Sequence, residues 1–112
     1  MENFIVVSPA DVNDDNLGDF VRSEGGDWFF MEAVGWQGTI SRRKAHVYLD
    51  LEPDVLSQYE QDELEQLVEE LGSEPRSMIS IHIGHQSGSR DLALLIAQKV
   101  QARWGGIVDL EP

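Results

Sequence analysis

The chain has 112 residues, which is enough for one domain over residues 1–112 and too few for two. Its 21 acidic and 8 basic residues give a formal net charge of −13, which disfavours direct binding to nucleic acid or to an anionic membrane. The absence of cysteine excludes disulfides and thiol catalysis. The chain has neither a signal-peptide pattern at its start nor a membrane-spanning apolar run, so we expect a cytoplasmic protein.

The first half of the chain predicts mainly β-strands. Residues 4–7 predict a short strand, which Ser8 and Pro9 end. Residues 8–26 contain many poor helix formers and predict a short irregular helix or a loop with one turn. Residues 28–34 and 39–51 predict a β-hairpin with a four-residue connection at 35–38. The second of these strands is continuous or bent into a pair around residues 42–44.

The second half predicts two helices, each followed by a strand. Ser57 and Glu60 have the spacing of a capping box, and an apolar stripe ending at Gly72 predicts a helix over 58–71. Residues 78–83 alternate as a strand, a serine at 87 or 89 caps a helix over 89–104, and 107–110 form a last strand. The fold class is therefore α+β, a mixed β-sheet of about five strands with two main helices packed on it. Strands 78–83 and 107–110 are expected to run parallel if they share the sheet.

Charge is the most distinctive feature of the sequence. Ten acidic residues and no basic residue lie between Asp50 and Pro75. They are compatible with a solvated face that keeps the protein soluble, or with a surface that binds a basic partner. For the second interpretation, the predicted partner-binding residues are Asp54, Glu60, Asp62, Glu63, Glu65, Glu69 and Trp36. Trp36 lies in the predicted 35–38 turn, where it is either an exposed anchor or part of the core. A second acidic set occupies the N-terminal region: Asp11, Asp14, Asp15, Asp19, Glu24 and Asp27.

The string His82-Ile83-Gly84-His85 offers an alternative function. It resembles the HIGH motif of class I aminoacyl-tRNA synthetases and related nucleotidyltransferases, which stabilises transferring phosphates at a helix N-terminus. Only 27 residues follow His85, and no matching lysine segment is present. The two histidines could bind a metal together with His46, but a structural role is favoured. We therefore expect no catalytic residues, no metal site and no cofactor, and predict that the protein is not an enzyme.

The C-terminal stretch from Ser80 to Leu110 resembles small bacterial proteins that end in a helix followed by Gly-Gly-(Val/Ile)-Val-Asp. Gly105, Gly106 and Asp109 are the most distinctive positions here. Such proteins are often found among polymorphic-toxin immunity proteins, and the size and acidity are similar to those of contact-dependent growth inhibition immunity proteins. The resemblance implies an immunity protein that neutralises a toxin domain. The acidity predicts that this toxin domain is cationic, and we expect a nuclease, because a nuclease presents Lys and Arg to phosphates. The alternatives are a small nucleotide- or metal-dependent enzyme using the turn at His82 and His85, and an acidic adaptor for another basic protein.

Overall fold

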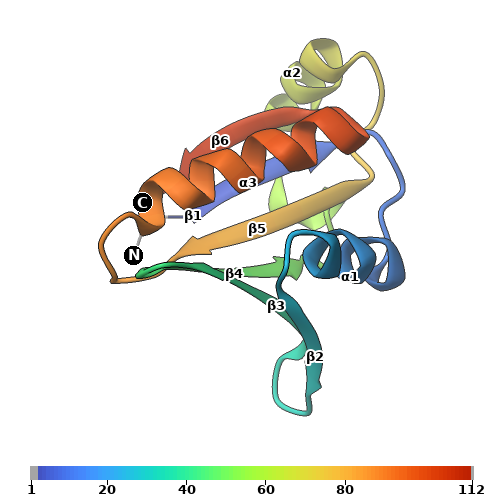
Figure 1. Ribbon diagram of the computed structural model, residues 1–112. Coiled ribbons are helices and arrows are strands. Elements are labelled where there is room, and N and C mark those ends of the chain that lie inside the picture. Colours follow the sequence, from blue (N-terminus) through green and yellow to red (C-terminus); the bar gives the residue numbers. More distant parts are fainter. Residues whose placement is uncertain (1–2, 112) are drawn as a thin grey trace.

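A six-stranded antiparallel sheet forms the centre of the structure, a computed structural model that describes residues 3–111 (Figure 1). The elements in chain order are β1 (Asn3–Ser8), α1 (Asp14–Ser23), β2 (Asp27–Met31), β3 (Gly35–Arg42), β4 (Ala45–Leu51), a 3₁₀ turn η1 (Leu56–Gln58), α2 (Gln61–Leu71), β5 (Ser77–Ile83), α3 (Ser89–Trp104) and β6 (Ile107–Glu111). The strand order is β2-β3-β4-β5-β1-β6. The predicted α+β class is confirmed, whereas the numbers of about five strands and two main helices were too low.

The predicted mixed sheet is also wrong, because every neighbouring pair of strands is antiparallel. β5 and β6 do run in the same direction, as expected for strands joined by a helix. However, β1 lies between them and pairs antiparallel with both. The extra strand arises because residues 35–51 form two strands, β3 and β4, with a tight turn at Arg43 and Lys44.

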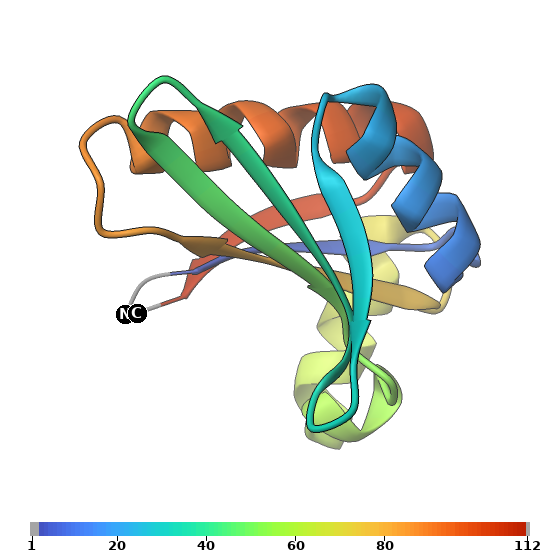
Figure 2. The same ribbon diagram turned by 60° about the horizontal axis from the view of Figure 1, so that its bottom comes forward.

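Helices cover both faces of the sheet (Figure 2). α1 and α3 lie on one face, where Leu17, Phe20 and Ile96 pack against Val47 and Ile81 in the larger apolar core. α2 lies on the opposite face, near β1 and β6. There Leu67 contributes to a smaller apolar cluster of Ile5, Val7, Val55 and Met78. Among residues 3–111, no helix covers the half of that face formed by β3, β4 and part of β5, where Ser80 and His82 bond acidic side chains.

The β2–β3 hairpin differs from its prediction in the position of the turn. The turn occupies residues 32–34, and Gly35–Gly38 belongs to β3. Gly38 is tolerated inside a strand because the Trp28 ring covers it: a Cβ at Gly38 would lie 2.9 Å from Trp28 Cε3. Trp36 is therefore a strand residue, yet its side chain is 42% exposed, as the anchor interpretation requires.

α2 begins later than predicted. Ser57 does not cap it, because its hydroxyl donates to the carbonyl of Asp54 in the preceding 3₁₀ turn. Glu60 is the N-cap, and its backbone N–H donates to Glu63 Oε1 at 3.3 Å. The predicted end is confirmed by Gly72, whose φ of 79° is readily adopted only by glycine. α3 has its predicted bounds, but Gly88, rather than either serine, is the N-cap.

Candidate functional site

The acidic residues of α2 divide between two sides of the helix. The apolar stripe of Leu64, Leu67, Val68 and Leu71 faces the sheet. At 100° per residue, Asp62, Glu65 and Glu69 lie on the opposite side, and all three are exposed. Glu63 is turned toward β6, where it lines a small cavity of about 170 Å³ together with Asp109. Of the predicted residues on this helix, Asp62, Glu65 and Glu69 therefore form an outward array, and Glu63 does not belong to it.

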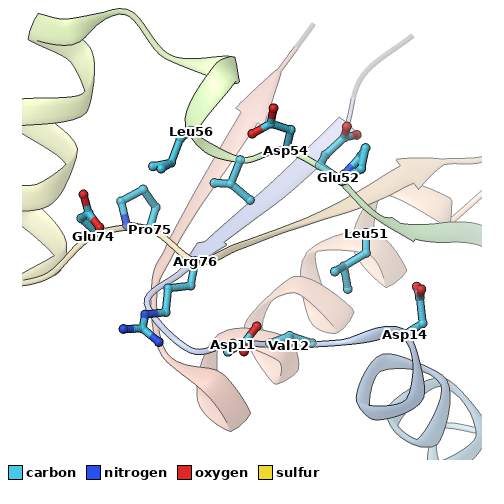
Figure 3. A pocket seen from close by; sticks show the side chains of 12 residues that line it. Asp11, Val12, Asp14, Leu51, Glu52, Asp54, Leu56, Glu74, Pro75 and Arg76 are labelled. Carbon is cyan, nitrogen blue, oxygen red and sulfur yellow. The ribbon is translucent and has the colours of Figure 1, made fainter.

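Two of the predicted residues precede the helix, and both are exposed. Asp54 does not face the outward array: it lines an open groove of about 590 Å³ at the end of β4 (Figure 3). Glu60 starts the helix as its N-cap. The groove is lined by Asp11 and Asp14 from the start of the chain, Glu52 and Asp54 after β4, and Glu74 before β5. Arg76 is the one basic residue among the described residues that line it.

Ser77 explains why the two acidic sets meet in this groove. Its hydroxyl is buried, donates to the carbonyl of Ala10 at 2.8 Å and accepts from the N–H of Val12 at 2.8 Å. These bonds fix the loop before α1 beside the start of β5, which places Asp11 next to the segment that carries Glu74. The sequence contains both acidic sets but gives no signal for this contact, because the contact depends on two hydrogen bonds across 65 and 67 residues of chain.

A smaller notch adjoins the groove. Its volume is about 320 Å³, and it shares Asp14, Leu51, Glu52 and Pro53 with the groove. Its remaining lining residues are Asp50 near the end of β4, Val34 in the hairpin turn, and Gly35 and Trp36 at the start of β3. Three acidic residues and no Lys or Arg are among its lining residues. The carboxylates of Asp50 and Glu52 are turned toward β5, where they bond His82 and Ser80. The predicted anchor, Trp36, borders this recess, but the strand register places its side chain on the sheet face opposite the carboxylates of Asp50 and Glu52.

Trp36 is held by aromatic neighbours on its own hairpin. Its ring stacks on Trp28 with a centroid distance of 6.2 Å and an interplanar angle of 6°, and Phe30 contacts it edge-on at 5.5 Å. Trp28 in turn packs against Gly18 of α1. The hairpin extends away from the body of the molecule (Figure 1) and exposes Phe30, Met31 and Val34 around its turn. Sequence analysis found Trp36 but missed this larger apolar tip.

Glu24, which was grouped with the N-terminal acidic set, has a structural role instead. Its carboxylate accepts from Lys99 Nζ at 2.7 Å and from Arg42 at 2.8 Å, which connects the end of α1 to α3 and β3. The hydrogen bond from Lys99, together with that from Arg42, lowers the pKa of Glu24 despite partial burial. Glu24 is therefore not available for a partner, and two of the eight basic residues are engaged away from the groove.

The two histidines of the HIGH-like string, His82 and His85, differ in their hydrogen bonding and in their exposure to solvent. His82, in β5, has both ring nitrogens engaged: Nε2 lies 3.1 Å from Asp50 Oδ2, and Nδ1 lies 3.1 Å from Asn3 Oδ1. The hydrogen bond to Asp50 raises the pKa of His82 against the opposing effect of burial. His85 is exposed, and His46 bonds Ser41 instead. Within residues 3–111 no His, Asp and Glu side chains are grouped as a metal site would require.

Comparisons of the chain with known protein families, with characterised proteins and with solved structures found no match. None of the helices in the described part of the chain is long and apolar enough to cross a membrane.

Proposed function

We propose that this protein is an immunity protein that binds and neutralises a cationic toxin domain with nuclease activity. The observation that carries the proposal is the convergence of the two acidic sets on the groove at the end of β4, where Asp11 and Asp14 lie with Glu52, Asp54 and Glu74. The outward array of Asp62, Glu65 and Glu69 adds three exposed acidic residues on α2. A surface built only for solubility does not require the two acidic sets to converge on one recess.

The physical logic starts from the substrate of a nuclease. Such an enzyme presents Lys and Arg side chains to phosphates, so its active surface is positively charged. An inhibitor that offers carboxylates in the same arrangement competes for those side chains and is drawn to them over a long range, which accelerates association. This function places the protein in the cytoplasm, where a toxin would reach nucleic acid. An acidic adaptor for another basic protein would use the same surface.

The experiment begins by identifying the toxin. Binding partners are captured by pulldown and identified by mass spectrometry. A basic partner domain is then purified, assayed for nuclease activity and titrated with this protein. We expect complete inhibition at a 1:1 ratio. Association is then followed by stopped-flow fluorescence between 50 and 500 mM NaCl, and the rate should fall as salt shortens the range of the charges. Uninhibited activity at excess protein would reject the immunity function.

Charge placement is tested with two triple variants that change the net charge equally. Replacing Asp62, Glu65 and Glu69 by Asn or Gln should slow association by about tenfold at low salt and leave dissociation nearly unchanged. The matched control neutralises three exposed acidic residues on the opposite layer: Asp15, Asp19 and Asp91. It should slow association by less than about twofold. Equal effects of the two variants would mean that only the net charge matters, and that α2 is not the contact.

A further inference from the structure

β2 forms one edge of the sheet, yet its sequence is that of a strand with neighbours on both sides. Its apolar residues from Trp28 to Met31 follow each other without the polar alternation of a half-exposed strand. Such runs are typical of strands that are buried on both faces of a sheet. Among residues 3–111, however, β2 pairs only with β3, so the backbone N–H and C=O groups along its outer side have no strand partner. Conflicts of this kind between local sequence and position are expected at functional sites.

The side chains of β2 are apolar on both faces of the sheet. The strand register places Trp28 and Phe30 on the face that carries the larger core, and Phe29 and Met31 on the other face. Trp28 packs against that core, but Phe30 is 57% exposed and Met31 is 45% exposed. β2 therefore offers apolar contacts above and below its free edge.

The opposite edge of the sheet, β6, is protected. Its Ile107 and Val108 pack into the apolar clusters on the two faces of the sheet, Asp109 places a charge in the middle of the strand, and α3 runs beside it (Figure 1). Charges and covering helices are the usual means by which proteins prevent pairing at a sheet edge. β2 contains no Lys or Pro, and its one charged residue, Asp27, stands at its first position. The unprotected edge of this sheet is therefore β2.

The chemistry of β2 defines what can pair with it. A row of free backbone donors and acceptors accepts an extended segment, as in β-strand addition. Apolar side chains on both faces favour apolar residues in that segment. Asp27 and Glu32, one on each side of the apolar run, are both exposed, and no Lys or Arg lies between Ser23 and Ser41. Basic residues in the segment are therefore favoured and acidic ones disfavoured. A second copy of this chain is disfavoured because each copy carries a net charge of −13.

We propose that β2 takes up an extended segment of the cationic partner, rich in basic and apolar residues, as a seventh strand of the sheet. This inference rests on the proposed function for the identity of the partner, and it names the place where that partner is held. The acidic surface attracts the partner over a distance. β2 then fixes it through backbone hydrogen bonds and apolar contacts, which act at short range and are screened little by salt.

The test uses short peptides, so that it does not depend on the toxin. The probe is an eight-residue peptide of alternating valine and lysine, and its binding to the complete protein is followed by ¹H–¹⁵N NMR at low salt. We expect a dissociation constant below about 1 mM and shifts of the amides of residues 27–31. We also expect nuclear Overhauser effects between backbone protons of the peptide and of β2, which arise only when the two strands pair.

Two control peptides separate strand pairing from charge. Neighbouring N–H groups of a strand point to opposite sides, so N-methylation of the two central residues of the probe blocks both of its edges. This peptide should bind at least about fivefold more weakly, because the central backbone hydrogen bonds are lost. A peptide of alternating valine and glutamate should bind at least about tenfold more weakly at low salt.

Matched substitutions at the two edges of the sheet locate the site. Phe30→Lys introduces the kind of charge that protects natural edge strands, and it should weaken binding of the valine–lysine peptide at least about fivefold. Leu110→Lys makes a similar change in β6, where the leucine side chain is 43% exposed. It should weaken binding less than about twofold, because it lies at the other edge of the sheet. Both variants change the net charge equally, and both replaced side chains are exposed, so both proteins should fold.

Several outcomes would overturn the inference. Shifts confined to α2 or β6, equal affinity of the N-methylated peptide, equal effects of the two lysine variants, or no binding at about 1 mM peptide would each exclude strand pairing at β2 and leave the proposed function intact. A dimer in light scattering that Phe30→Lys dissociates would show that β2 pairs with a second copy instead. Failure of the proposed function has a different signature, because there the nuclease stays active at excess protein while the peptide results are unaffected.

Discussion

Gly18 connects the fold to the candidate site, and its replacement by alanine gives a prediction with a definite sign. Gly18 lies in α1 directly against Trp28, the ring on which Trp36 stacks. A Cβ at this position would lie 2.7 Å from Trp28 Cδ1, 2.9 Å from Nε1 and 3.0 Å from Cγ. We predict that Gly18→Ala destabilises the protein, although the same change in an exposed helix is normally stabilising.

The magnitude follows from two opposing contributions. Alanine is favoured over glycine in a helix by about 1 kcal/mol. Inserting a methyl group into a filled contact costs about 1–3 kcal/mol. The higher part of that range applies here, because the ring of Trp28 is confined between Gly18, Gly38 and Trp36 and cannot easily move away. The net loss in the free energy of unfolding is therefore about 1–2 kcal/mol, which lowers Tm by about 4–8 °C for a domain of this size.

The assay is urea unfolding followed by far-UV circular dichroism, carried out as a double-mutant cycle with Trp28→Leu. In the Trp28→Leu background the contact is removed, so Gly18→Ala should stabilise the protein by up to about 1 kcal/mol. The coupling energy between the two positions should reach about 1–3 kcal/mol. If Gly18→Ala stabilised the wild-type protein, or if the coupling were zero, the packing of α1 against the hairpin would be wrong.

Two further predictions concern the sheet. Ile81 is fully buried in β5. Ile81→Asp should therefore lower the free energy of unfolding by more than about 4 kcal/mol and leave no cooperative unfolding transition. An unchanged melting temperature would contradict the placement of this strand face in the core. Because the pKa of His82 is raised in the folded state, the stability from its bond to Asp50 is fully present below its unfolded value of about 6.5. That stability should be lost as pH rises through the raised pKa. Asp50→Asn should flatten this part of the stability profile measured by urea unfolding between pH 5.5 and 9, and an identical profile for both proteins would refute the assignment.

Helices and strands in which apolar residues recur at regular spacing could be predicted from the sequence. The alternation in β5 places Ile79 and Ile81 in the core, and both are fully buried. The stripe of α2 and the glycine after it gave the correct end of that helix. In these segments the local pattern and the tertiary packing favour the same structure, so the pattern alone is informative.

α1 was underestimated because its local sequence opposes its final structure. Asparagine, aspartate and glycine are weak helix formers, and the helix is stabilised by features that propensity does not describe. Asn13 accepts from the N–H of Asn16 at 2.8 Å and caps the first turn. Leu17 and Phe20 then bury one side of the helix in the core. Most of the stability of a helix this short comes from such packing.

The turns were the least predictable part of the chain. Gly35 and Gly38 look like the ends of a turn, but Gly38 is in a strand because the Trp28 ring needs the space of a side chain. Conversely, the turn between β3 and β4 contains no glycine, and Arg43 adopts a φ of 58° that is uncommon for a residue with a Cβ. The acidic groove was missed for a related reason, because its two sides come together through tertiary contacts, among them the hydrogen bonds of Ser77 and the bond from the N–H of Arg76 to the carbonyl of Ser8.

The proposed site divides recognition between two physical effects that salt separates. The charges of α2 act over roughly a Debye length, about 8 Å at physiological ionic strength, so their contribution is lost from the association rate as salt rises. A partner contact with the exposed apolar tip of the β2–β3 hairpin would instead act at van der Waals distance, where salt has little effect. High salt should therefore slow the formation of the complex far more than it shortens its lifetime. A surface that bound by charge alone would instead lose both together, because nothing would hold the partner once the field is screened.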